Sequence, residues 1–132
     1  MLLVDTNVLV DVLQDDPVWV DWSLAQLRAQ AIIHQLVTNP VIYSEISVSF
    51  STIEGLDRAV AVLALQMEEI PKPALFLAAK AYAQYRGRGG VKLQVLPDFF
   101  IGAHAAVAGW PLLTRDASRF RTYFPTLEVV AP

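Results

Sequence analysis

Three aspartates stand where a predicted strand ends or a predicted helix begins, a setting in which carboxylates can do chemistry. Asp5 follows the apolar run LLV, Asp98 opens the apolar stretch 98–110, and Asp116 comes two residues after the run PLLT at 111–114. The free N–H groups of a helix N-terminus stabilise a single carboxylate, so each acid alone is explained as a cap. Several acids at one edge of a parallel sheet would instead repel one another unless a divalent cation neutralised them. Because all the donors are oxygen atoms, the pattern points to Mg²⁺ or Mn²⁺.

Short apolar runs alternate along the chain with longer stretches of helical periodicity, which is typical of strands joined by crossover helices. Strands are expected at 2–4, 35–38, 67–70, 111–114 and 127–130. Helices are expected at 17–30, 39–50, 53–65, 73–87 and 98–110, and a long loop at 86–97. The sequence therefore predicts an α/β fold with a small, mainly parallel sheet, whose carboxyl edge would carry the acids.

Length and composition limit the classes of protein that fit. A chain of 132 residues is the size of one compact domain, so we expect residues 1–132 to form a single domain. The chain contains no cysteine and no cationic leader, which suits a cytoplasmic protein, and no apolar run is long enough to span a membrane. The net charge of −3 argues against an unaided polyanion binder. The hydrophobic content of 55% favours an apolar contact surface, such as that of a homodimer.

Three segments resemble one known family. They are LLVDTNVLVDVL at 2–13, NPVIYSEIS at 39–47 with Glu45, and LPDFFIGAHAAVAGWPLLTRDASRF at 96–120. Together they resemble the PIN domain, and specifically the VapC-type toxins of bacterial or archaeal toxin–antitoxin systems. The resemblance spans nearly the whole chain and implies a three-layer α/β/α sandwich with ribonuclease activity.

The resemblance also implies a catalytic site built on four acids. These are Asp5, Glu45, Asp98 and Asp116. In the family such acids bind one or two Mg²⁺ or Mn²⁺ ions and hydrolyse RNA, and here Asp5, Asp98 and Asp116 are the expected ligands. Two ions about 4 Å apart can activate water and stabilise the leaving oxygen. Their four positive charges would also move the net charge from −3 to +1, which removes the objection to an RNA substrate.

Other polar residues near these acids are expected to assist them. Thr6 and Asn7 follow the first acid and Thr114 precedes the last, so they are expected to orient a carboxylate or a metal-bound water. Arginine and lysine bind phosphate, and several flank the predicted site. The expected RNA contacts are Arg86, Arg88, Lys92 and Arg115, with Arg119 and Arg121 close to the last acid.

Several further residues are interpreted as structural. His104 lies six positions after Asp98, about 240° around a helix, so a packed or surface histidine is expected there. Asp11, with Asp15 and Asp16, is expected at a solvated helix end. Gly102 lies one turn after Asp98 and could leave room beside the carboxylate or serve helix packing.

Alternative functions depend on features that can be checked in the sequence. A phosphatase of the haloacid dehalogenase type would need a second Asp at position 7, which is Asn7 here. A receiver-like domain would need a mid-chain Asp after a strand and a late lysine at a strand end, and neither is evident in this sequence. A non-catalytic PIN scaffold that binds protein or RNA stays open, although the four acids favour an enzyme. The expected partner is a cognate antitoxin, which would cover helices near 17–30 and 39–65 and place a basic side chain on the acids.

Overall fold

The computed structural model describes all 132 residues and contains one parallel sheet of five strands. The strands are β1 (Leu2–Val4), β2 (Leu36–Thr38), β3 (Gln66–Met67), β4 (Leu112–Leu113) and β5 (Val129–Val130). Their order across the sheet is β3-β2-β1-β4-β5, and every neighbouring pair is parallel. The chain therefore builds outward from β1 in one direction and then in the other.

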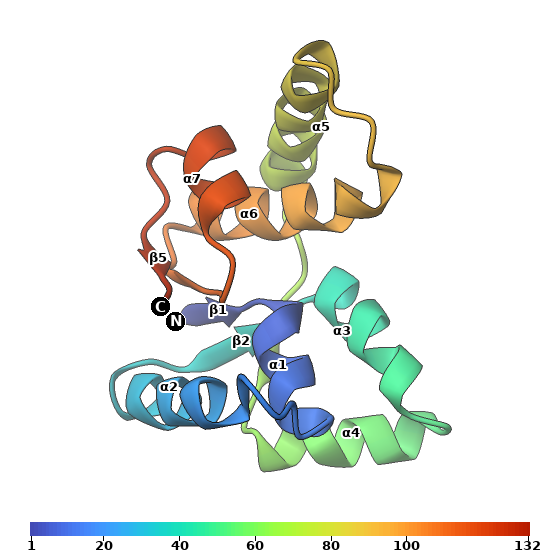
Figure 1. Ribbon diagram of the computed structural model, residues 1–132, viewed down its shortest axis with the longest axis vertical. Helices are drawn as coiled ribbons and strands as arrows, with labels where there is room; N and C mark the ends of the chain where they lie inside the picture. The colour runs from blue at the N-terminus through green and yellow to red at the C-terminus, as the bar shows by residue number, and fades with distance from the viewer.

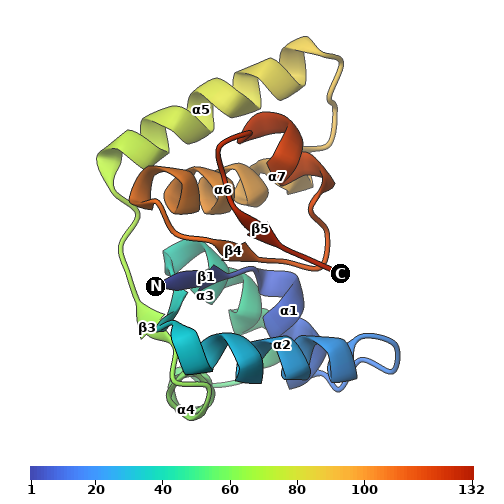
Figure 2. The same cartoon turned by 90° about the vertical axis from the view of Figure 1, so that its left-hand side faces the viewer.

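Seven α-helices cover the sheet in two layers (Figures 1 and 2). They are α1 (Thr6–Leu13), α2 (Val20–Ile33), α3 (Pro40–Ile46), α4 (Ile53–Val62), α5 (Lys72–Gly87), α6 (Leu96–Ala108) and α7 (Ser118–Tyr123). Helices α1 to α4 lie on one side of the sheet, and α5 to α7 lie on the other. This confirms the predicted α/β/α sandwich. None of the helices is both long enough and apolar enough to cross a membrane.

Local sequence explains where the elements begin and end. All three residues of β1 are fully buried, as expected for a central parallel strand. Asn39 caps α3 by accepting a hydrogen bond from the Ile42 N–H, and Pro40 occupies the first helical turn. Helix α6 ends at Gly109, whose φ of 71° is the left-handed conformation that glycine adopts without strain.

The structure corrects three of the predicted boundaries. Helix α2 begins at Val20 instead of 17, because the Asp16 carboxylate accepts the N–H groups of residues 18 and 19 and holds a turn there. Strand β3 is shorter than 67–70, since its partner β2 ends where Asn39 caps α3. The helix expected at 73–87 ends at Gly87 as predicted, but the loop expected at 86–97 is shorter, because a 3₁₀ turn at 93–95 leads directly into α6, which begins at Leu96.

Charge is divided unequally between the two helical layers. Residues 1–70, which include α1 to α4, hold ten acidic and two basic side chains, a net charge of −8. Residues 71–132, which include α5 to α7, hold three acidic and eight basic side chains, a net charge of +5. The modest overall charge of −3 therefore combines an acidic half with a basic half.

Candidate active site

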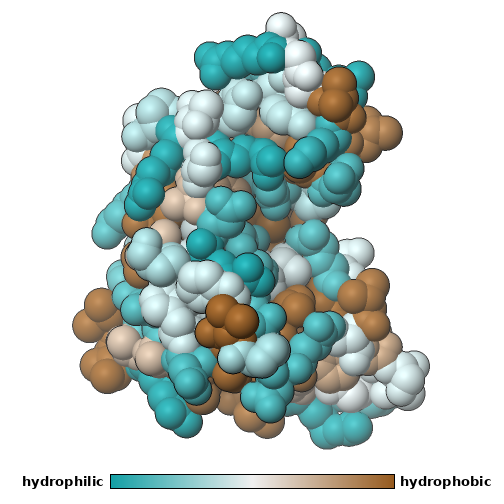
Figure 3. Space-filling view, in the orientation of Figure 1, coloured by the Kyte–Doolittle hydropathy of each residue, from teal (hydrophilic) through white to brown (hydrophobic).

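The candidate site lies at the carboxyl ends of β1 and β4, where the strand order reverses. Val4 pairs with Leu113 across these strands, so the residues that follow them, Asp5 and Thr114, are neighbours. Open parallel sheets commonly bind ligands at such a switch point. In Figure 3 the surface is hollowed between the two helical layers, on the side toward which β1 points in Figure 1.

Asp5 is buried and its carboxylate is held from two sides. The Thr6 N–H donates to Oδ1 at 2.8 Å, which also caps α1, and the Thr114 hydroxyl donates to Oδ2 at 2.8 Å. Burial raises the pKa of Asp5 to about 7, and the charges of Asp98 and Glu45 add to the rise against these two hydrogen bonds. Asp5 is therefore a carboxylate in an environment that lacks positive charge.

Glu45 and Asp98 reach the same site from α3 and α6. The Thr6 hydroxyl donates to Glu45 Oε1 at 2.6 Å. Burial raises the pKa of Glu45, and the charge of Asp98 adds to this increase although the Thr6 hydrogen bond opposes it. Burial also raises the pKa of Asp98, with the Arg119 guanidinium opposing and the charge of Asp116 contributing to the rise. Asp5, Glu45 and Asp98 thus lie close enough to raise one another's pKa values, whereas Asp116 affects only Asp98.

Thr114 and Asn7 organise the loop that carries the fourth acid. The Thr114 hydroxyl, which donates to Asp5, accepts hydrogen bonds from the Asn7 side-chain amide at 3.3 Å and from the Asp116 N–H at 3.1 Å. The Asn7 side-chain oxygen accepts the Arg115 N–H at 3.2 Å. Asp116 itself is exposed. These bonds fix the loop after β4 against the start of α1.

The donor chemistry of the site fits a divalent cation, although no ligand set is assembled. The carboxylates supply only oxygen donors, and added positive charge would relieve the burial and repulsion that raise their pKa values. No group of three or more His, Cys, Asp or Glu side chains is arranged to hold a metal ion. Asp98 is instead paired with an arginine, because Arg119 Nη1 donates to Asp98 Oδ2 at 2.7 Å.

Asp11 is buried, so the prediction that it lies at a solvated helix end is wrong. Its carboxylate accepts the Ser23 hydroxyl at 2.7 Å and both Nε and Nη2 of Arg115, at 2.9 and 3.0 Å. The Arg115 guanidinium also lies 5.3 Å from the ring centre of Trp19. Arg115, a predicted RNA contact, therefore joins the loop after β4 to α1. Asn7 and Asp11 are four residues apart and so lie on the same face of α1, and both accept hydrogen bonds from Arg115. That shared face was the one feature of the sequence that placed Asp11 on the same side of the helix as the candidate site residue Asn7.

Two other residues near Asp98 have structural surroundings. His104 is buried, and its Nδ1 lies 3.1 Å from the Asn39 side-chain nitrogen, as expected for a packed histidine. A Cβ at Gly102 would lie 2.5 Å from the Phe124 ring, so this glycine permits α6 to approach α7. The packing interpretation of Gly102 is the one that the structure supports.

The remaining basic residues lie near the end of α5. Arg86, Arg88 and Lys92 are exposed, and the Arg88 guanidinium lies 5.3 Å from the ring centre of Tyr123. The Tyr85 hydroxyl accepts the Lys92 N–H at 3.1 Å, which ties the connecting turn to the helix. These side chains are free to meet an anion.

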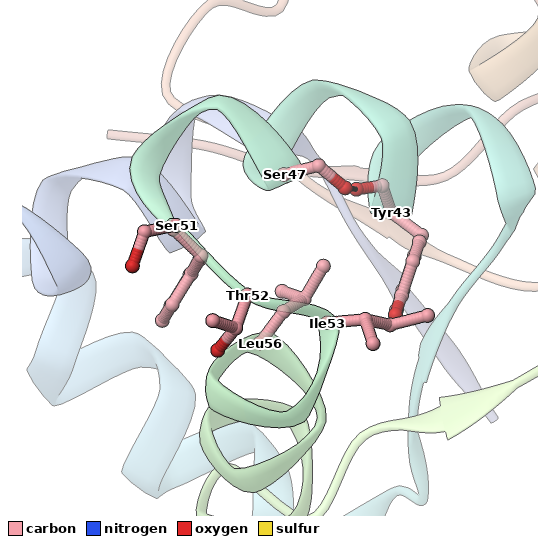
Figure 4. Close-up of a pocket in the computed structure, with 7 residues that line it drawn as sticks. Tyr43, Ser47, Ser51, Thr52, Ile53 and Leu56 are labelled. Carbon is pink, nitrogen blue, oxygen red and sulfur yellow. Dashed lines mark hydrogen bonds between the residues drawn. The ribbon is translucent and has the colours of Figure 1, made fainter.

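Two pockets open in the two halves of the chain. One, of about 310 Å³, lies beside the acids and is lined by Tyr85, Asp116, Ser118, Arg119, Thr122 and Tyr123. The other, of about 260 Å³, lies between α3 and α4 (Figure 4) and is lined by Tyr43, Ser47, Phe50, Ser51, Thr52, Ile53 and Leu56. The first belongs to the basic half of the chain and the second to the acidic half.

Known protein structures have a fold similar to that of this chain. The chain is similar to a chain in the crystal structure of VapBC2 from Rickettsia felis bound to a promoter DNA fragment, with 15% identity, a TM-score of 0.74, and coverage of 98% of this chain and 97% of the other. It is also similar to a chain of a toxin–antitoxin complex from Klebsiella pneumoniae, with 21% identity and a TM-score of 0.71. A third similar chain is that of VapBC-1 from nontypeable Haemophilus influenzae, with 16% identity and a TM-score of 0.71. Both alignments cover 98% of this chain and 96% of the other. No curated protein sequence matches significantly. Residues 2–124 match the PIN domain, and the chain therefore belongs to the PIN domain family.

Proposed function

We propose that this chain is a metal-dependent ribonuclease that acts as the toxin of a type II toxin–antitoxin pair. The observation that carries the proposal is the grouping of Asp5, Glu45 and Asp98, where burial and mutual repulsion raise all three pKa values, with Asp116 close enough to raise the pKa of Asp98. Carboxylates in such a position fit a cation that interacts with phosphate.

Each acid has a distinct place in the proposed site. Asp5, Asp98 and Asp116 would hold Mg²⁺ or Mn²⁺, and Glu45 completes the acidic pocket. The bound cation would supply the positive charge that activates a water molecule and stabilises the leaving oxygen of the phosphodiester. Thr114 and Thr6 hold the carboxylates of Asp5 and Glu45 in fixed orientations through short hydrogen bonds. Arg119 has to leave Asp98 Oδ2 before that oxygen can bind a cation.

The basic half of the chain supports RNA as the substrate. Arg86, Arg88 and Lys92 are exposed in the half that carries a net charge of +5, and Arg88 lies over Tyr123, which lines the same pocket as Asp116. A phosphate backbone that follows this surface would approach the site over cations before it meets the carboxylates. Arg115 contributes to this surface only through the part of its side chain that Asp11 leaves accessible, since 30% of it is exposed.

The pocket between α3 and α4 supports an antitoxin as partner. Figure 4 shows Tyr43 and Ser47 facing Ile53 and Leu56 across it, and most of its lining is apolar. Val48 and Ile53 are exposed beside it. An amphipathic antitoxin segment that covers this surface would also meet the acidic half, so basic side chains suit its polar face. The solved structure of similar fold from Klebsiella pneumoniae is described as a toxin–antitoxin complex, which is consistent with such a partner.

The proposal includes a homodimer. Leu75 and Phe76 of α5 are exposed, at 42% and 68%, and Met67 of the edge strand β3 is exposed at 43%. Exposed apolar side chains of this size are commonly covered in oligomers. Measurement of the mass in solution by light scattering tests this part of the proposal.

A non-catalytic scaffold is the second candidate. Two observations favour it: Asp98 is paired with Arg119, and no group of three acids is arranged to hold a metal ion. A permanent ion pair would hold the site in an inactive form. Binding of Mn²⁺ measured by calorimetry separates the two candidates, because only the enzyme requires it.

The central experiment is RNA cleavage by the purified protein with Mg²⁺ or Mn²⁺. Cleavage is expected to stop when a chelator is added and to fall by more than about a hundredfold in Asp98→Asn, because removal of a ligand should exceed the effect of removing its supporting contacts. Asp21→Asn, an exposed acid at the start of α2, is the matched control and should retain activity. Full activity of Asp98→Asn, or cleavage that persists in chelator, would contradict the metal mechanism.

The toxin assignment has a separate test. Expression of the chain alone should stop growth, and co-expression with the neighbouring gene product should restore it. If the chain cleaves RNA but its neighbour neither binds it nor changes cleavage, the nuclease assignment stands and the toxin–antitoxin assignment fails.

A further inference from the structure

The pocket of about 310 Å³ between α5 and α7 opens directly beside the acids. Asp116 of the acidic site and Arg119, the partner of Asp98, are two of its six lining residues. Its other walls are Tyr85 from α5 and Tyr123 from the end of α7. The pocket thus extends the candidate active site toward the basic half of the chain.

The two tyrosines form an aromatic wall that the core holds in place. Their ring centres are 6.1 Å apart with an interplanar angle of 79°, and each also packs on the buried Phe99 ring, at 5.5 Å from Tyr85 and 5.3 Å from Tyr123. One side of each ring is therefore fixed by the core while the pocket remains open on another side. A rigid, half-buried aromatic wall is suited to a flat ligand, because little side-chain freedom is lost on binding.

Cationic and hydroxyl groups surround this wall. The Arg119 guanidinium lies 5.9 Å from the ring centre of Tyr85, and the Arg88 guanidinium lies 5.3 Å from that of Tyr123. Ser118 and Thr122 add hydroxyl groups from successive turns of α7, and the Thr122 hydroxyl donates to the Ser118 carbonyl oxygen at 2.9 Å. Planar guanidinium groups beside aromatic rings bind phosphate and stack with bases.

The positive charge of the chain around this pocket favours an anionic ligand. The half of the chain that builds most of the pocket carries +5, and the one carboxylate in the lining is Asp116, whose charge a metal ion would neutralise in the proposed site. A ligand that combines a flat ring with a negative group matches both the tyrosines and the arginines. A nucleotide has this combination, and single-stranded RNA presents its bases unpaired for stacking.

We propose that this pocket binds one nucleotide of single-stranded RNA next to the phosphate to be cleaved, with the base against Tyr85 and Tyr123 and the phosphate on Arg119. The inference rests on the proposed ribonuclease function and specifies how its substrate is held. Arg119 serves two sites in this arrangement. It pairs with Asp98 when the pocket is empty and turns to the phosphate when RNA is bound.

The test measures binding of a fluorescein-labelled, unstructured RNA dodecamer in chelator, where no metal-dependent cleavage can occur. Stacking of a base is lost in Tyr123→Leu, which keeps an apolar side chain against Phe99, and the affinity should fall about tenfold. Arg119→Gln should weaken binding about as much, whereas Tyr123→Phe should bind like the wild type. Tyr43→Leu and Arg28→Gln, on the acidic half, are the matched controls and should change the affinity less than about twofold.

Thr122→Glu provides a variant that leaves the core intact, because residue 122 is exposed on α7. Its added carboxylate should repel a phosphate in the pocket and weaken binding. Photo-crosslinking with 4-thiouridine in the dodecamer should label Tyr85 or Tyr123. Crosslinks confined to Tyr43, or equal affinities of the pocket variants and their controls, would overturn the proposal.

The two proposals fail in distinguishable ways. If the wild-type protein binds the dodecamer through this pocket but cleaves no RNA with any divalent cation, the nucleotide site stands and the nuclease function fails. If it cleaves RNA but the pocket variants bind as the wild type does, the nuclease function stands and the nucleotide site fails.

Discussion

The two helical layers of this protein present opposite chemistry around one site. Residues 1–70 carry −8, and their pocket between α3 and α4 is lined mainly by apolar side chains. Residues 71–132 carry +5, and their pocket between α5 and α7 is lined by tyrosine, arginine and hydroxyl groups. Because the layers differ so much, a polyanion and a basic, amphipathic protein segment would approach the acids from different sides.

The acids lie where the two layers meet, and they are contributed by both. Asp5 and Glu45 belong to the acidic half, whereas Asp98 and Asp116 belong to the basic half. The net charge of −3 conceals this arrangement, which explains how a chain with an acidic balance can offer a surface for RNA. The comparison therefore predicts that variants act differently according to the layer in which they lie.

The largest effect on the free energy of unfolding is expected at Asp5, which lies where the two layers meet. Its pKa rises from 3.8 to about 7 on folding, so the folded protein binds the Asp5 proton more tightly than the unfolded chain does. The stability that this protonation contributes is fully present below pH 3.8 and is lost as the pH rises through 7. A difference of this size corresponds to about 4 kcal/mol over the whole window.

Urea unfolding in chelator at pH 5 and pH 8 checks this expectation. The wild type should lose about 3 kcal/mol more stability than Asp5→Asn between these two pH values, because asparagine does not ionise. Asp5→Asn should therefore be the more stable protein at pH 8 even though it should not cleave RNA. If the stability of the two proteins depended equally on pH, the pKa of Asp5 would not be raised in the folded state.

The second effect concerns the ion pair that joins the two halves. Arg115→Gln removes the partner of Asp11, whose side chain is 1% exposed, and leaves that charge buried. The free energy of unfolding should fall by about 3 kcal/mol. Arg28→Gln, which removes an exposed arginine of α2, is the control and should have little effect.

A second substitution separates stability from RNA contact. Asp11→Asn added to Arg115→Gln should recover part of the lost stability, since the uncompensated charge is gone. Affinity for RNA should stay near that of the wild type in the double variant. A tenfold loss of affinity with unchanged stability would show that Arg115 contacts RNA directly.

The contrast between Arg115 and the acids shows what the sequence could predict. The α/β layers and the candidate acids followed from local patterns and from the resemblance to PIN domains, because Asp5 and Asp116 come just after strands while Glu45 and Asp98 lie in short contiguous motifs. The Asp11–Arg115 pair joins residues 104 positions apart and depends on the register of β1 against β4. The division of charge was visible in the sequence, but its meaning required the knowledge that the two halves form opposite layers.

The pocket beside Asp116 was beyond prediction for a similar reason. Tyr85 and Tyr123 come from separate helices, and only the packing of α5 and α7 around Phe99 brings their rings together. The end of α5 at Gly87 was predicted, but the sequence did not indicate that Arg88, the residue after it, would lie over Tyr123 of α7.

The third prediction concerns the proposed antitoxin surface on the acidic half of the chain. Ile53→Asp places a carboxylate at the rim of the pocket between α3 and α4, where the side chain is 63% exposed. Antitoxin affinity should fall at least about tenfold, because a desolvated charge would face an apolar segment. RNA cleavage should stay unchanged, since the substitution lies in the other layer. Leu75→Asp on α5 is the matched control and should leave antitoxin binding intact.

The smallest effect is expected from the exposed cations of the basic half. Replacing Arg88 and Lys92 with glutamine should lower RNA affinity a few-fold at low salt, and each lost phosphate contact should reduce the slope of log affinity against log salt by about 0.7. The control replaces Arg28 and Arg58, which removes the same total charge from the acidic half. A global effect of net charge would change both double variants equally. If the two layers act as separate surfaces, only the Arg88 and Lys92 variant should show the shallower slope, while the free energy of unfolding of both variants stays within about 0.5 kcal/mol of the wild type.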